Sequence, residues 1–141
     1  MKGRFWVPVI VVFILFAVLD FILHGMLLGG AYKATASVWR PMEEMNSLMW
    51  LMYFGTLIHA FFFVFIFTKG YEGKGIGEGI RYGMYMGLFF GIAMSIGTYT
   101  SMPITGTIAW AWLLGTLVES VLAGAVVARL YKPPAPVAAQ A

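Results

Sequence analysis

Four ionisable side chains lie inside the long apolar segments of this sequence: Asp20, His24, His59 and Glu119. Titratable groups within a membrane-crossing helix are rare and energetically costly, so each of them marks a candidate site for proton or ion chemistry. A helical rise of about 1.5 Å per residue, counted from the expected cytoplasmic ends, puts His59 and Glu119 at depths of about 14–16 Å and Asp20 and His24 at about 24–30 Å. The sequence therefore predicts two polar layers at different depths.

The inner layer pairs His59 with Glu119. Glu119 continues a line of small residues at Ala111, Gly115 and Ala123. Residues at this spacing share one helix face, so we expect Glu119 to face protein rather than lipid. The pair is either a proton-accepting site in a transport path or a buried hydrogen bond that fixes two helices together. We favour the second interpretation, because polar contacts commonly fix the packing of membrane helices.

The outer layer contains Asp20 and His24, which stand at positions i and i+4 of one helix and are close enough to pair. Polar side chains on two other helices fall at a similar depth: Tyr53, Ser95, Thr98 and Tyr99. The layer is either a pocket open to the outer side for a cation, a proton or a small ligand, or a helix end that reaches interfacial water. In the second case, which we favour, Arg40 or Lys33 supplies the countercharge.

Several other kinds of chemistry are excluded or weakly supported. The chain has no cysteine, which rules out thiol redox chemistry, Cys-ligated zinc and iron–sulfur clusters. A bis-histidine haem needs both ligands at one level, whereas His24 and His59 differ in depth by about 16 Å. No phosphate-binding glycine loop, nucleophile elbow or zinc-protease motif is present. We therefore expect no metal, no cofactor and no enzymatic activity; an enzyme acting on a lipid or quinone has the least support.

The composition is that of an all-α integral membrane protein. Of 141 residues, 61% are hydrophobic and 11% are charged, far from the values of soluble domains. Apolar runs of spanning length predict four transmembrane helices in an antiparallel up-down bundle, at about residues 6–28, 41–68, 76–99 and 105–130. These form one domain over residues 1–131, with an irregular loop at 29–40. Residues 132–141 form a Pro/Ala-rich tail that we expect to be mobile.

Positive charges predict the orientation of the helices. One side of the predicted bundle carries Lys2, Arg4, Lys69, Lys74, Arg81, Arg129 and Lys132, and the other carries Lys33 and Arg40. This imbalance places both termini in the cytoplasm, and we expect the protein to lie in a bacterial cytoplasmic membrane. The formal charge of +3 reflects this topology. No basic cluster points to nucleic acid.

A strip of small residues runs along the third predicted helix at every fourth position: Gly75, Gly79, Gly83, Gly87, Gly91 and Ser95. Residues at this spacing stack on one helix face, and small residues let membrane helices approach closely. A second line on the last helix comprises Thr116, Ser120, Gly124 and Ala128, with Gly115 on the neighbouring small-residue line. At the start of the third helix, Glu78 and Arg81 are spaced to form an ion pair.

These features favour a small, non-catalytic membrane protein. A bundle of four helices has limited internal contact area, and two small-residue lines are more than this area needs. We therefore expect one line to be free for contact with another copy of the chain or a larger membrane protein. The function favoured by the sequence is therefore an accessory subunit or self-associating packing module in the lipid bilayer. The alternative is a small oligomeric proton- or cation-linked transporter that uses Asp20 with His24 and His59 with Glu119.

Overall fold

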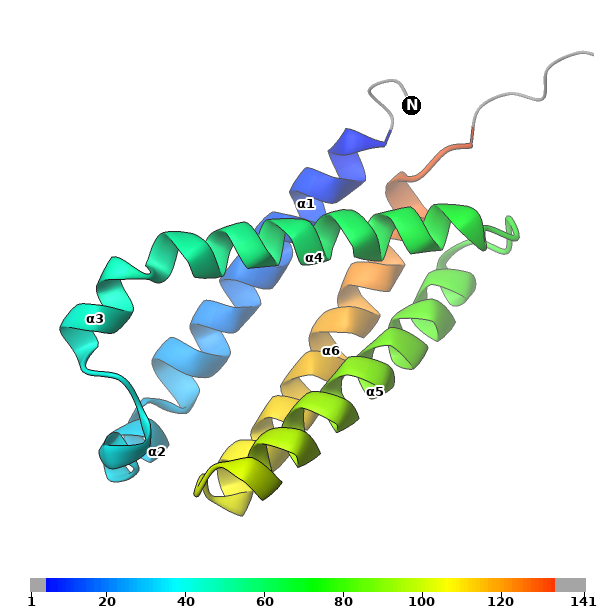
Figure 1. Ribbon diagram of the computed structural model, residues 1–141. Helices are drawn as coiled ribbons and strands as arrows, with labels where there is room; N and C mark the ends of the chain where they lie inside the picture. Colours follow the sequence, from blue (N-terminus) through cyan, green and yellow to red (C-terminus); the bar gives the residue numbers. More distant parts are fainter. Residues whose placement is uncertain (1–4, 134–141) are drawn as a thin grey trace, which may run out of the picture.

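The computed structural model describes residues 5–133, which contain helices and connections but no strand (Figure 1). The helices in chain order are α1 (Trp6–Asp20), the π-helix η1 (Phe21–Leu27), α2 (Gly29–Ala34), the 3₁₀ turn η2 (Ala36–Val38), α3 (Met42–Ser47), α4 (Met49–Lys69), α5 (Ile76–Ser101) and α6 (Gly106–Leu130). Most of the predicted tail, from residue 134 onward, lies outside the described residues, as do Lys2 and Arg4.

Three stretches of the described residues are long and apolar enough to cross a membrane: Trp6–Leu27, Met49–Lys69 and Gly106–Leu130. They indicate an integral membrane protein. Helix α5 is also long enough, with 26 residues, but it is not among the three. The predicted count of four membrane-crossing helices is therefore not confirmed.

The predicted antiparallel up-down bundle is not confirmed. Helices α5 and α6 lie against each other along their length, and α1, which runs in a similar direction, packs on α6 and α4 (Figure 1). Helix α4 crosses the other three obliquely (Figure 1). Its contact with them is confined to its second half, where Ala60, Phe63, Val64 and Phe67 are buried.

The hydrophobic core forms where α1, α4 and α6 meet. Val9, Val12 and Phe16 of α1 pack with the buried residues of α4 and with Ala123 and Val127 of α6. Helix α5 joins this core through Tyr82, whose hydroxyl donates to the Phe63 carbonyl at 2.5 Å. This hydrogen bond gives the glycine-rich helix a directional tie to the crossing helix.

Two predicted helices are interrupted. The first changes at Phe21 from α to π geometry, in which Leu28 N donates to Leu23 O at 2.9 Å, five residues back. The second is split at Leu48, whose backbone angles (φ −96°, ψ 0°) end α3 and begin α4. The predicted irregular loop at 29–40 is also wrong, because it contains α2 and η2.

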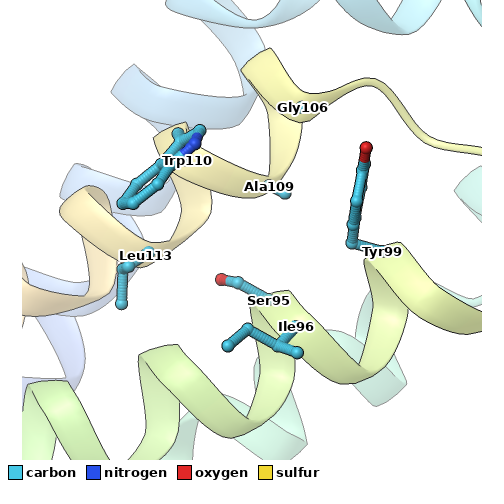
Figure 2. A pocket seen from close by; sticks show the side chains of 7 residues that line it. All are labelled: Ser95, Ile96, Tyr99, Gly106, Ala109, Trp110 and Leu113. Atoms are coloured by element: carbon cyan, nitrogen blue, oxygen red, sulfur yellow. The ribbon is translucent and has the colours of Figure 1, made fainter.

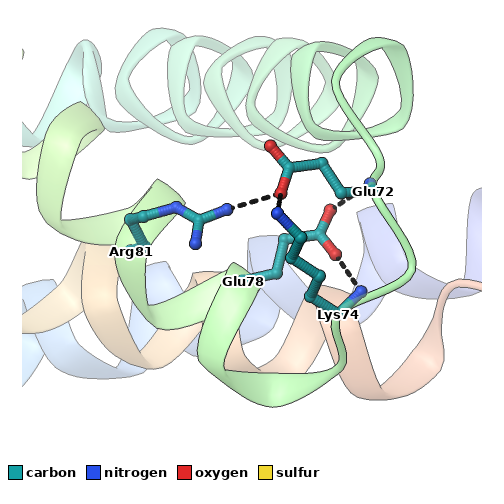
Figure 3. Close-up of polar contacts among 4 residues, drawn as sticks. All are labelled: Glu72, Lys74, Glu78 and Arg81. Carbon is teal, nitrogen blue, oxygen red and sulfur yellow. Dashed lines mark hydrogen bonds and ion pairs between the residues drawn. The ribbon is translucent and has the colours of Figure 1, made fainter.

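Four charged residues at the α4–α5 connection form a network (Figure 3). The Glu78 carboxylate is 4% exposed and accepts the backbone N–H of Glu72 at 2.6 Å and of Lys74 at 2.7 Å. Glu72 pairs in turn with Lys74 and Arg81. The predicted Glu78–Arg81 pair is therefore replaced: Glu78 satisfies the turn backbone, and Arg81 binds Glu72. The hydrogen bond and charge of Lys74, with Arg81, lower the pKa of Glu72.

Candidate functional site

Two residues of the predicted outer layer, Asp20 and His24, lie with aromatic side chains of α2 and α6. We call this group the Asp20 cluster and define it as Asp20, His24, Tyr32 and Trp112. His24 Nε2 lies 3.8 Å from Asp20 Oδ1. His24 Nδ1 lies 2.5 Å from the Tyr32 hydroxyl, which also accepts the indole N–H of Trp112 at 2.8 Å.

The groups that can only donate set the direction of these hydrogen bonds. An indole N–H can only donate, so the Tyr32 oxygen accepts from Trp112 and its own hydrogen is directed to His24 Nδ1. Burial raises the pKa of the Tyr32 phenol, which keeps that hydrogen on the oxygen. In neutral His24 the remaining hydrogen is then on Nε2, on the side of Asp20. That hydrogen faces the Asp20 carboxylate, at a separation of 3.8 Å that is too long for a direct hydrogen bond.

Backbone geometry and a small residue bring the cluster together. The residues of η1 follow Asp20 directly, and the chain bends at Leu28 into α2, where Tyr32 lies against the His24 ring. Trp39 supports Tyr32 through an edge-to-face contact and donates to Thr35 Oγ1 at 2.9 Å. Short π-helical segments occur often at functional sites.

Glycine 115 lets η1 approach α6. A Cβ atom added at Gly115 would lie 2.3 Å from Leu23 Cδ2, so a larger residue there would push against the π-helix. Gly115 therefore packs against the first membrane-crossing stretch and lies one turn from Glu119 on α6. The helix contact that Gly115 makes is therefore on the face of α6 that also carries Glu119.

The structure keeps one of the two predicted pairs, Asp20 with His24. Among the described residues, no hydrogen bond or ion pair joins this pair to Glu119. The side chains of Asp20 and His24 are each 40% exposed. Within the residues that the structure describes, no hydrogen bond or ion pair joins His59 to Glu119, so the predicted inner pair is wrong.

His59 instead lies among aromatic rings at the α4 crossing. Its ring stacks on Phe16 at 5.0 Å between centroids and meets Phe63 and Phe90 edge-on. Its Nε2 atom is buried and has no hydrogen-bond partner. The depth estimate failed here because it assumed that α4 runs parallel to α6, whereas α4 crosses it.

The predicted small-residue strip lies against α6 of the same chain. Gly79, Gly83, Gly87 and Gly91 are buried, and a Cβ added at Gly79 or Gly83 would lie 2.1 Å from a backbone oxygen of α6, that of Gly124 or Ser120. We call this contact the α5–α6 seam. Gly75 is not part of it, because Gly75 precedes the helix and has a φ of +73°.

The second small-residue line forms the other side of the seam. A Cβ added at Gly124 would lie 2.1 Å from the Gly79 oxygen, and Ser120 and Ala128 face Gly87 and Gly79. Ser95 continues the strip and is buried. The expectation that one line would be free for a partner is therefore wrong.

The sequence did not predict Tyr32 and Trp112 as members of the site. Tyr32 lies in the segment predicted as a loop and Trp112 lies on another helix, so helical spacing related neither to His24. Among the residues that the structure describes, no three His, Asp or Glu side chains are grouped to hold a metal ion.

Comparison with known proteins adds no further information on the site: no family model, no curated protein and no solved structure matches this chain.

Proposed function

We propose that the protein binds a proton or small cation at the Asp20 cluster and passes it on as part of proton- or cation-linked transport. The observation that carries this proposal is the hydrogen-bonded chain from Trp112 through Tyr32 to His24, which ends beside the Asp20 carboxylate. Such groups are expensive to keep in a membrane protein, and here they gather at one place.

Charge supports the same function. Asp20 and Glu119 lie within stretches long and apolar enough to cross a membrane, where an ionised carboxylate is costly. A proton or a cation bound at either carboxylate removes this cost. His24 adds an imidazole, which can both accept and donate a proton, and the partial exposure of Asp20 and His24 gives the site access to its surroundings.

We also propose that α5 completes four membrane-crossing helices, with both termini in the cytoplasm of a bacterium. The close packing of α5 along α6 supports its placement in the membrane, since the glycines on its contact face are covered. The excess of Lys and Arg on one side of the predicted topology supports the orientation.

Transport can be measured in proteoliposomes that contain a pH-sensitive dye, under imposed proton, sodium or potassium gradients. We expect Asp20→Asn and Glu119→Gln each to lower the flux by about tenfold, as expected for loss of a proton-exchanging group. Glu43→Gln, which changes an exposed carboxylate on α3, is the matched control and should leave the flux unchanged. Equal flux in wild type, Asp20→Asn and Glu119→Gln would refute the proposal.

A second candidate function is that of an accessory subunit or self-associating module. The first half of α4 carries it, because residues 49–58 contain no buried side chain and present Trp50, Leu51 and Phe54. The absence of native cysteine allows a direct test. Phe54→Cys should form a disulfide-linked dimer in native membranes, whereas Val118→Cys, exposed on α6, should not. Monomers only, or equal cross-linking at both positions, would contradict a specific contact at α4.

A further inference from the structure

A pocket of about 290 Å³ lies between α5 and α6, beyond the last glycine of the seam (Figure 2). Its walls are largely apolar and include Ile96 and Leu113, the ring of Tyr99 and the ring of Trp110. The volume is at the lower end of the range for small-molecule sites. It fits a compact ligand of one or two rings.

Ser95 supplies a polar group in this apolar setting. The residue is 3% exposed, it lines the pocket, and Figure 2 shows its hydroxyl directed among the lining side chains. Its Oγ atom has no hydrogen-bond partner. A buried donor without an acceptor is unfavourable, so a ligand that accepts a hydrogen bond from this hydroxyl would remove an energetic cost.

Neighbouring hydroxyl groups show that Ser95 differs from its surroundings. Thr100 donates to Ile96 O at 3.0 Å and Ser101 donates to Gly97 O at 2.8 Å, each to the carbonyl four residues earlier in the same helix. This is the ordinary way for a helix to satisfy a hydroxyl. Ser95 makes no such bond, so its hydroxyl hydrogen has no partner within the helix.

We infer that this pocket binds a planar, uncharged ring compound that carries a carbonyl oxygen. The oxygen accepts the Ser95 hydroxyl hydrogen, and the ring lies beside the Tyr99 and Trp110 rings, where offset or edge-on aromatic contacts are favourable. An ionised ligand would lose its hydration against walls that offer no countercharge. The membrane-soluble chemical class with these features is the quinone-like ring carbonyls.

The test compares 1,4-naphthoquinone with naphthalene, which has the same rings without the oxygens. The full chain is placed in lipid nanodiscs, and ligand binding is measured by equilibrium dialysis against empty nanodiscs, which corrects for partition into lipid. We expect saturable binding of naphthoquinone at one site and no saturable binding of naphthalene. Equal binding of both compounds, or no saturable binding of naphthoquinone, would overturn the inference.

Two variants locate the site, each with a control. Ser95→Ala removes the unpaired hydroxyl without disturbing a bond in the fold, and should weaken naphthoquinone binding by about fivefold to tenfold, the worth of one hydrogen bond. Gly106→Leu should abolish binding by filling the pocket. Gly97→Leu is matched to it, because a Cβ at either glycine meets nothing within 4 Å, but Gly97 does not line the pocket. Unchanged affinity in Ser95→Ala, or equal loss in both glycine variants, would refute the assignment.

Discussion

Helix α6 has two faces that do different work. One face carries Ser120 and Gly124 and meets the glycines of α5 so closely that an added Cβ would lie 2.1 Å from backbone oxygen. The other carries Trp112, Gly115 and Glu119 and meets η1 and α2 through side chains. The first face is buried and without charge, and the second keeps ionisable groups in partial contact with the surroundings.

The difference shows how a small membrane protein can separate rigidity from chemistry. A seam in which backbone meets backbone leaves little freedom, because neither side can rotate away. The Asp20 cluster is held by side chains and a few hydrogen bonds, and side chains can rotate where a backbone contact cannot. The Asp20 cluster therefore adjoins a helix, α6, that the seam holds rigidly in place.

The largest expected effect on stability comes from adding one methyl group to the α5–α6 seam. Gly83→Ala places a Cβ against Ser120 backbone and should lower the free energy of unfolding by about 3 kcal/mol, a high value for overpacking. The measurement is unfolding in mixed micelles followed by circular dichroism. Gly97→Ala is the matched control, since its Cβ meets nothing, and should be neutral or stabilising. Equal stability of both variants would show that the seam is loose.

The start of the seam depends on Glu78, which fixes the turn before α5. Glu78→Ala leaves the backbone N–H groups of Glu72 and Lys74 without their acceptor, and should cost about 2 kcal/mol, as for hydrogen bonds to a charged group. Glu43→Ala, at an exposed site on α3, should change stability by less than about 0.5 kcal/mol. The same unfolding measurement applies, and a wild-type value for Glu78→Ala would contradict the capping role.

On the polar face, Tyr32→Phe tests the cluster while keeping its packing. The change leaves the Trp112 indole and His24 Nδ1 without their shared partner, and should lower stability by about 1 kcal/mol. Proton flux in the liposome assay should fall several-fold, because the hydroxyl orients His24. Reduced stability with unchanged flux would mean that the hydroxyl is only structural.

Gly115→Ala sharpens the contrast between the two faces of α6. Its Cβ would meet the end of the Leu23 side chain at 2.3 Å, and a side chain can rotate where a backbone cannot. The strain of about 1 kcal/mol for a displaced rotamer is offset by the higher helix propensity of alanine, about 0.5–1 kcal/mol. We expect stability close to wild type in the unfolding assay. A loss as large as that of Gly83→Ala would make the faces equivalent.

The smallest effect is expected at the exposed ion pairs of Glu72. Lys74 and Arg81 lower its folded-state pKa below the ordinary value of 4.5, so its contribution to stability is complete above about pH 4.5 and disappears as the pH falls through the lower folded value. The stability difference between wild type and Glu72→Gln should therefore shrink on acidification and with added salt. A difference that grows in acid would reverse the sign of the linkage.

Much of the local structure could be predicted from the sequence. The apolar runs gave helix bounds close to those of α5 and α6, and spacing put Asp20 beside His24. Periodicity describes one helix at a time, however, and it has no information on the direction in which the next helix leaves. The bend at Leu48 and the oblique path of α4 therefore separated His59 from Glu119, although the bounds of α6 and the end of α4 were predicted well.

The sequence by itself determined that this is an apolar, helical membrane protein and that one helix presents a strip of glycines every four residues, because composition and helical spacing are local properties. Only the tertiary structure decided what covers that strip and which side chains meet. The seam is closed by α6 of the same chain, and Tyr32 meets His24 across the bend at Leu28. The physical reason is that contacts between distant segments depend on a few backbone angles at breaks such as Leu28 and Leu48, and no residue pattern specifies those angles.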